Sequence, residues 1–212
     1  MKIYFAGPLF TPYVRQFISE HAQILRENGI EPFVPHESFK PVIAPEIVES
    51  LLEQGLLTRD ELEGRSVPDL AIELLRKGRL TREQLGLPPR SAEFIFDKDY
   101  EGLSNANAVV ALLDGTQVDD GTACEIGIFY GLLRDEASQG EASQGEVSQG
   151  EVTKKGIVGF MTDSRGVRQM EHGYGINLFV LGVIEECGMV FNDFDDVLAQ
   201  LKAWDAELRA NG

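Results

Sequence analysis

The chain has 212 residues, of which 43% are hydrophobic, and its formal net charge at pH 7 is −16. This length and apolar content are enough for one domain of ordinary size with a sizeable core and room for an insertion. The negative charge argues against nucleic acid and anionic membrane surfaces as partners, because both bind basic faces, and leaves a small neutral or cationic ligand open.

The N-terminal part of the chain predicts a β-α-β unit. Residues 2–6 form an apolar run typical of a buried strand, and a Gly-Pro turn follows it. Residues 12–28 have the pattern of a helix that ends at a glycine, and residues 30–35 form a second short strand. This opening favours an α/β fold with a parallel, doubly wound sheet, in which ligands bind at the carboxyl ends of the strands.

Residues 45–90 are rich in charged residues and leucine, and they predict a small helical insertion. They contain an internal repeat, because residues 51–62 and 74–85 share the pattern Leu-Leu-x-x-Gly-x-Leu-Thr-Arg-x-x-Leu. In each copy a helix ends at the glycine and another starts at the threonine, with the capping-box pairs Thr58–Glu61 and Thr81–Gln84. The insertion could be a lid, an interface or decoration, and the absence of a catalytic pattern favours the latter two.

The next segment predicts a short helix over residues 94–103, followed by an apolar run at 106–113 that is typical of a central strand. The loop at 114–121 then leaves the carboxyl end of that strand, where parallel sheets usually bind ligands. A further helix is expected to start at Thr122.

The residues alone leave two interpretations of Glu125 open. Thr122 and Glu125 fit a capping box, in which the threonine bonds the third helical N–H and the glutamate reaches back to the cap. Alternatively, Glu125 lies one turn into the helix, where the positive end of the helix dipole favours an ionised carboxylate. A positioned, ionised carboxylate can act as a nucleophile.

The segment after this helix contains three copies of the pentapeptide Glu-x-Ser-Gln-Gly. We expect an exposed, mobile loop at about residues 136–151, because such polar copies cannot bury a core. The sheet resumes at residues 156–161, and residues 176–184 predict a mainly apolar helix with Asn177 as its cap or as a ligand contact. Residues 194–208 predict an amphipathic terminal helix.

The two cysteines, Cys124 and Cys187, have no CxxC spacing and suggest neither a disulfide framework nor a zinc site. We expect Cys124 to be a small buried apolar residue. The N-terminal segment lacks the longer apolar core of a signal peptide, and no apolar run is long enough to span a bilayer, so a cytoplasmic protein is expected.

Taken together, these residues resemble the nucleoside 2-deoxyribosyltransferase family. Four short motifs carry the resemblance, in the family's order: residues 3–7, Asp99 with Gly102 and Leu103, the run from Asp119 to Gly127, and residues 176–178. The resemblance covers most of the chain outside residues 45–90 and the pentapeptide loop. It implies one domain over residues 1–212 with a flavodoxin-like fold, which the family shares with nucleoside-monophosphate N-glycosidases.

The resemblance also implies roles for individual residues. Glu125 falls on the nucleophile that attacks the anomeric carbon, Tyr4 on the hydroxyl that holds this carboxylate, and Asp99 on an acid near the nucleobase. The substrate-binding positions it implies are Gly7 in the first motif, and Asp119 and Asn177 at the 5′ end of the sugar. Members of the family share each pocket between subunits, so a homo-oligomer with shared active sites is expected, with no cofactor and no metal.

The predicted function is transfer of 2-deoxyribose between nucleobases in nucleoside salvage, through a covalent deoxyribosyl-Glu125 intermediate and with retention of configuration. This chemistry is also reasonable apart from the family resemblance, because cleavage of an N-glycosidic bond requires one carboxylate near the anomeric carbon and one acid near the leaving group. Deoxynucleosides and free nucleobases are the expected ligands, and the preference for purine or pyrimidine stays open.

Two alternatives stay open as well. The first is a hydrolase of deoxynucleoside 5′-monophosphates. Related hydrolases tend to carry serine where this chain has Asp119, which would repel a dianionic phosphate, whereas Arg165 and Arg168 keep this alternative open. The second is a non-catalytic nucleotide-binding or assembly module, in which Glu125 is only a helix cap and the helical insertion docks a partner.

Overall fold

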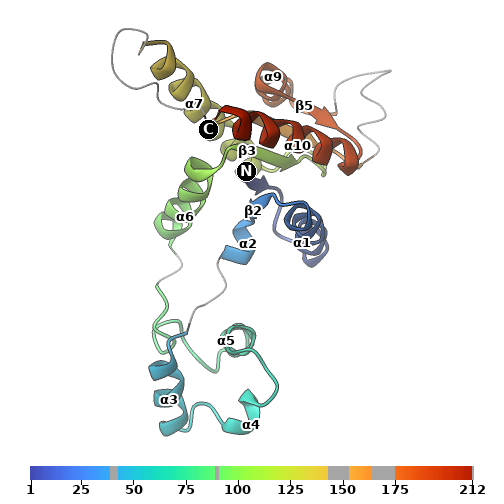
Figure 1. Ribbon diagram of the computed structural model, residues 1–212. Helices are drawn as coiled ribbons and strands as arrows, with labels where there is room; N and C mark the ends of the chain where they lie inside the picture. Colours follow the sequence, from blue (N-terminus) through green and yellow to red (C-terminus); the bar gives the residue numbers. More distant parts are fainter. Residues whose placement is uncertain (39–42, 89–90, 143–152, 164–174, 212) are drawn as a thin grey trace. The chain divides into compact units, whose positions relative to one another are not determined.

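The computed structural model describes the chain in five stretches: residues 1–38, 43–88, 91–142, 153–163 and 175–211 (Figure 1). It divides into two compact units. One unit, the sheet unit, consists of Met1–Pro35 and Tyr100–Gly212, and the other, the helical unit, is His36–Asp99. The helical unit covers more residues than the insertion expected at residues 45–90, because it also includes the segments that lead into and out of the repeat.

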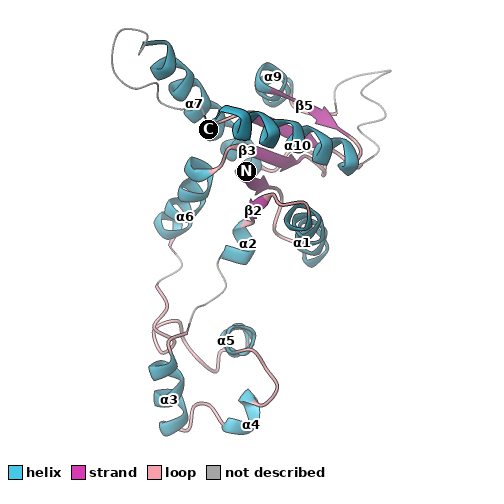
Figure 2. Cartoon of the chain, in the orientation of Figure 1, coloured by secondary structure: helices cyan, strands magenta, loops and turns pink. Residues whose placement is uncertain are grey.

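Within the described residues, the sheet unit contains a five-stranded parallel sheet with the strand order β2-β1-β3-β4-β5 (Figure 2). The strands are β1 (Lys2–Ala6), β2 (Glu31–Phe33), β3 (Ala108–Leu112), β4 (Gly156–Phe160) and β5 (Gly188–Phe191). This is the flavodoxin-like order, so the predicted α/β fold with a doubly wound sheet is confirmed. Strand β5 was not expected from the sequence.

Helices cover both faces of the sheet. The first face packs against α1 (Pro12–Glu27) and α10 (Phe194–Asn211). The second face packs against α6 (Ala92–Asn105), α7 (Asp120–Ala142) and α9 (Leu178–Cys187). Alternate residues of β1 serve the two cores: Ile3 and Phe5 face the first, and Tyr4 and Ala6 the second.

Helix α7 differs from the prediction at both ends. It begins at Asp120 rather than Thr122, and it continues through Ala142, so the expectation of a loop from residue 136 was wrong for the first pentapeptide copy. Glutamate, alanine and glutamine are good helix formers, and extending an existing helix needs no new nucleus. The other two copies lie largely outside the described residues. Glu136 Oε1 accepts hydrogen bonds from the backbone N–H groups of Thr153 and Lys154, which joins α7 to the segment before β4.

The helical unit gives the sequence repeat a repeated local structure. Its described helices are α2 (Pro35–Ser38, whose first residue belongs to the sheet unit), α3 (Pro45–Glu53), α4 (Arg59–Leu62), α5 (Val67–Arg76) and the part of α6 up to Asp99. After α3 and after α5 the chain turns at a glycine with positive φ, 68° at Gly55 and 66° at Gly78. Thr58 and Glu61 form the predicted capping box, and Thr81 and Gln84 make the same reciprocal hydrogen bonds.

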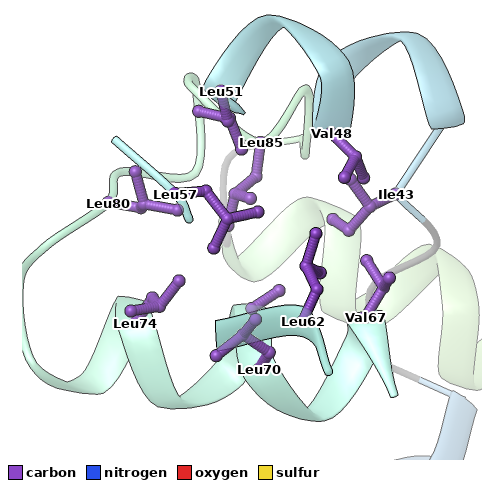
Figure 3. A pocket seen from close by; sticks show the side chains of 11 residues that line it. Ile43, Val48, Leu51, Leu57, Leu62, Val67, Leu70, Leu74, Leu80 and Leu85 are labelled. Carbon is purple, nitrogen blue, oxygen red and sulfur yellow. The ribbon is translucent and has the colours of Figure 1, made fainter. Parts of the chain in front are cut away.

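The helical unit has an apolar core of its own. Its buried residues are Leu51, Leu57, Leu70, Ala71, Leu74, Leu80 and Leu85. Figure 3 shows the side chains of this core around a cavity of about 10 Å³. Such a cavity is at most the size of a single water molecule, so it belongs to the core packing and is not a ligand site.

We predict that acidic pH weakens the helical unit through Glu61 and Glu73. Hydrogen bonds, chiefly from Arg79 to Glu61 and from Lys77 to Glu73, lower the pKa of each carboxyl from 4.5 to about 2. Both folded-state pKa values lie below the unfolded ones. The stabilisation is therefore complete above about pH 4.5 and is lost as the pH falls towards 2. The effect is modest, because the pairs lie on the surface.

The measurement is thermal unfolding, followed by helical ellipticity, at pH 7, 4.5 and 3. Between pH 4.5 and 3 the wild type is expected to lose more stability than the Glu61→Gln/Glu73→Gln variant. The exposed pair Glu53→Gln/Glu83→Gln makes the same change in charge and serves as the control. Equal pH slopes for the wild type and the Glu61/Glu73 variant would contradict the prediction.

Candidate active site

The structure brings together two residues that lie 121 positions apart, Tyr4 on β1 and Glu125 on α7. The Tyr4 hydroxyl donates a hydrogen bond of 2.5 Å to Glu125 Oε1. Tyr4 is 0% exposed and Glu125 is half-buried. A buried hydroxyl needs a partner, and a hydrogen bond to a carboxylate is stronger than one between neutral groups. The pair is therefore a fixed part of the fold, with the carboxylate held at one oxygen.

The pair lies where the order of the strands reverses. Strands β1 and β3 are neighbours in the sheet. The next strand after β1 lies on one side of this pair, and the next strand after β3 lies on the other side. Parallel sheets bind ligands outside the carboxyl ends of the strands at this switch point. Glu125 follows β3 on α7, and Tyr4 stands in register with Val109 of β3. The half-buried carboxylate is thus placed where the fold predicts a ligand.

Asp119, not Thr122, caps the helix that carries Glu125. Asp119 Oδ2 accepts hydrogen bonds from the backbone N–H of Thr122 at 3.1 Å and from its hydroxyl at 3.4 Å. The predicted Thr122–Glu125 capping box was wrong, because α7 begins at Asp120 and Thr122 is already its third residue, 1% exposed. Glu125 lies in the second turn, where the helix dipole is weaker, and the hydrogen bond from Tyr4 restrains its carboxylate.

A second pair of acids joins the loops that follow β3 and β4. Asp114 accepts hydrogen bonds from the backbone N–H groups of Thr162, at 2.7 Å, and Asp163, at 3.2 Å, and from the Thr162 hydroxyl. Asp163 in turn accepts from the backbone N–H of Gly115 at 3.1 Å. The sequence placed Asp114 only at the end of a strand. This link joins the segments after β3 and β4 at residues 114–115 and 162–163. Arg165 and Arg168 lie outside the described residues.

The other predicted substrate-binding residues have structural roles of their own. A Cβ on Gly7 would lie 2.8 Å from Ile18 Cδ1, so close packing alone explains this glycine. Asn177 is the cap of α9, and its side chain accepts a hydrogen bond of 2.9 Å from the Phe179 N–H. These roles leave substrate contacts at Gly7 and Asn177 as predictions.

Asp99 belongs to the other unit of the structure. It is the last residue of the helical unit, on the part of α6 that precedes the sheet unit. Tyr4 and Glu125 are both in the sheet unit. The proximity of Asp99 to the Tyr4–Glu125 pair therefore stays a prediction.

The described residues also give information on Cys124, on groups of possible metal ligands and on membrane-spanning helices. Cys124 is exposed, so the expectation that it is buried was wrong; on α7 the buried positions nearby are Ile126 and Phe129. Within the described residues, no group of three His, Cys, Asp or Glu side chains could hold a metal ion. In the same part of the chain, every helix is too short or too polar to cross a membrane.

Comparisons with known proteins agree with this architecture. A solved structure of a conserved protein from Enterococcus faecalis V583 is 20% identical, with a TM-score of 0.57, and the match covers 96% of this chain and 98% of that chain. The 2-deoxyribosyltransferases of Bacillus psychrosaccharolyticus and Leishmania mexicana are 21% and 16% identical, with TM-scores of 0.49 and 0.47. These matches cover 93% and 94% of this chain and 90% and 95% of the respective enzymes.

No curated protein sequence matches the chain significantly. The family model for nucleoside 2-deoxyribosyltransferase, in contrast, matches residues 3–199, which is nearly the whole chain. The chain therefore belongs to the nucleoside 2-deoxyribosyltransferase family, whose enzymes carry out deoxyribosyl transfer or related N-glycosidic chemistry.

Proposed function

We propose that this protein transfers 2-deoxyribose from a deoxynucleoside to a second nucleobase through a covalent intermediate on Glu125. The observation that carries the proposal is the hydrogen bond of 2.5 Å from Tyr4 to Glu125 Oε1 at the switch point of the sheet. A carboxylate that is only a helix cap bonds backbone N–H groups of its own helix. Glu125 accepts a hydrogen bond from a buried hydroxyl on another element, which a helix cap does not require and a positioned nucleophile does.

The proposed reaction has two displacements at the anomeric carbon. Glu125 attacks this carbon through a carboxylate oxygen, the bond to the first base breaks, and the base leaves with a proton supplied by an acid, for which Asp99 is the candidate. The second base then attacks the same carbon, gives up its ring N–H proton to the acid that was deprotonated in the first step, and releases Glu125 as a carboxylate. Two inversions give net retention, and the release of the first base before the second reacts gives ping-pong kinetics.

Tyr4 has the role of orienting the nucleophile. Its ring is stacked on Phe33, with the centroids 5.3 Å apart and an angle of 17° between the planes, so the hydroxyl starts from a fixed position. Its hydrogen bond restricts the rotation of the Glu125 carboxylate. Because positioning of a reacting group contributes to rate directly, this restriction favours attack over unproductive orientations.

The charge at the start of α7 favours nucleosides over nucleotides as substrates. Asp119 places a carboxylate at the loop before α7, and a 5′-phosphate nearby would be repelled unless cations compensate it. A sugar hydroxyl, in contrast, can donate a hydrogen bond to a carboxylate. This supports transfer between free nucleosides and nucleobases, as in nucleoside salvage, over hydrolysis of 5′-monophosphates.

We also propose that a second copy of the chain completes each site. Next to Asn177, the first two residues of α9 are exposed apolar side chains, with Leu178 59% and Phe179 83% exposed. Apolar side chains of this size are usually covered when they lie together on a surface. The position of these two side chains beside Asn177 is consistent with Asn177 contributing to the pocket of the neighbouring copy.

The first test replaces the two members of the central pair. We predict that Glu125→Gln lowers the rate of base exchange by about three orders of magnitude or more, because the nucleophile is removed. Tyr4→Phe is expected to lower kcat by about 10- to 100-fold, since a hydrogen bond to a charged group contributes about 1.5–3 kcal/mol. The assay follows exchange between deoxyadenosine and each natural base.

Both variants are nearly isosteric, so unchanged ellipticity and thermal unfolding serve as the control for folding. Mass spectrometry of the wild type mixed with donor alone is expected to show one deoxyribosyl group on Glu125, and none in the Glu125→Gln variant. Unchanged turnover in Glu125→Gln would refute the proposal. Binding of nucleoside without release of base would instead support a non-catalytic module.

The second test separates the two roles of Asp119. Asp119→Asn keeps a good cap and removes the charge, whereas Asp119→Ala removes both and costs about 1 kcal/mol of stability. We therefore predict that both variants turn over the 5′-monophosphate faster relative to deoxyadenosine than the wild type does. Only Asp119→Ala is expected to unfold at a lower denaturant concentration. A substrate ratio that stays the same in both variants would contradict the role of the charge.

A further inference from the structure

Gly102 of α6 is part of a sequence motif but has no role in the proposed chemistry. A Cβ at this position would lie 2.7 Å from both Cδ1 and Cε1 of Phe33 and 2.9 Å from its Cζ. These distances are shorter than carbon atoms tolerate, so any larger residue must move the ring or the helix. The glycine therefore lets the backbone of α6 pack directly against the Phe33 ring.

Phe33 also contacts the active-site tyrosine. It is the last residue of β2 and stands in register with Tyr4 on β1, and the two rings are stacked with centroids 5.3 Å apart. Phe33 thus contacts the α6 backbone as well as the Tyr4 ring. A side chain added at Gly102 displaces Phe33, and Phe33 can move only by shifting Tyr4 or by losing the stacking.

The position of the Tyr4 ring decides the geometry of its hydroxyl. Tyr4 is completely buried, and its hydroxyl reaches Glu125 Oε1 at 2.5 Å, a short bond that a shift of a few tenths of an ångström changes appreciably. The contacts thus form a continuous series from Gly102 through Phe33 and Tyr4 to Glu125, and all four residues lie in the sheet unit.

We propose that Phe33 and Gly102 are positioning residues, which hold the Tyr4 ring where its hydroxyl orients Glu125. For catalysis this inference rests on the proposed function, whereas the packing of the four residues does not. The two residues also flank the helical unit: Phe33 lies three positions before His36, and Gly102 three positions after Asp99. In the sequence, the insertion therefore lies between Phe33 and Gly102. These two residues must stay in contact for the Tyr4–Glu125 pair to keep its geometry.

The test compares two substitutions of glycine by alanine inside helices. Gly102→Ala introduces the clash with Phe33. Gly131→Ala, at an exposed position of α7, is the matched control, because a Cβ there has no atom within 4 Å. Gly102→Ala is expected to lower kcat for base exchange about tenfold, with a change in KM of less than about threefold, as for the loss of a hydrogen bond to a charged group. Gly131→Ala is expected to match the wild type.

A double substitution tests whether Gly102 acts through Phe33. Leucine at residue 33 has no counterpart of Cε1 and Cζ, and its two Cδ atoms can rotate away from a methyl group at residue 102. In the Phe33→Leu background, Gly102→Ala is therefore expected to lower kcat by less than about threefold, although it lowers kcat about tenfold in the wild type. Equal effects in the two backgrounds would overturn the inference, because they would show that Gly102 acts without Phe33.

A measurement independent of activity separates this inference from the proposed function. Tyrosine labelled with ¹³C at the ζ carbon reports the hydrogen bond of each hydroxyl by NMR, and the Tyr4 signal is identified by its loss in Tyr4→Phe. We expect this signal to shift in Gly102→Ala and in Phe33→Leu, but not in Gly131→Ala. A wild type without exchange or hydrolysis would refute the proposed function and leave the NMR result to decide the inference.

An unshifted Tyr4 signal in a folded Gly102→Ala protein would overturn the inference, whatever the activity. If Gly102→Ala does not fold, the Phe33→Leu variant alone tests the inference, because it removes the stacked ring without adding an atom near α6. A shifted Tyr4 signal together with a reduced kcat in this variant supports the positioning role. An unshifted signal in this variant would refute it.

Discussion

The hydrogen bond from Tyr4 to Glu125 joins the first strand of the sheet to the helix that follows the third strand. Each group would be costly to bury without the other, because an unpaired hydroxyl and an unpaired carboxylate both lose their hydration. The parallel pairing of β1 with β3 and the burial of Ile126 and Phe129 of α7 bring the two groups together. The fold thus brings Tyr4 and Glu125 within reach of each other, and the hydrogen bond between them holds the Glu125 carboxylate in place.

At the start of α7, one acid has an observed structural role and a proposed role in recognition. Asp119 caps the helix through Thr122, and its carboxylate also lies at the carboxyl end of β3, where a ligand is expected. A capping carboxylate is held in place by the backbone, so it presents a fixed negative charge to any group that approaches. The effect on substrate choice that we propose for Asp119 therefore needs no other side chain to hold its carboxylate in place.

The sequence predicted the features that depend on local pattern, such as the first strand, the central strand and the capping box at Thr58. It failed where tertiary packing decides. Strand β5 has only four residues, which are at most half-buried, and it forms because β4 offers an edge to pair with. The contact of Phe33 with Gly102 depends on strand register and on the approach of α6, and neither leaves a signal in the spacing of residues.

The helical insertion is compatible with the site because of where it is attached. Its connections begin just after Phe33 and end just before Gly102, and these residues are in contact within the sheet unit. The entropy cost of closing a segment between two such residues grows only slowly with its length, by about 0.6 kcal/mol for each doubling, so a long insertion is tolerated at this place. The segment also has its own buried leucines, so it does not compete for the core of the sheet. The contact between Phe33 and Gly102 therefore has two consequences: it closes the base of the insertion, and it keeps Tyr4 against Glu125.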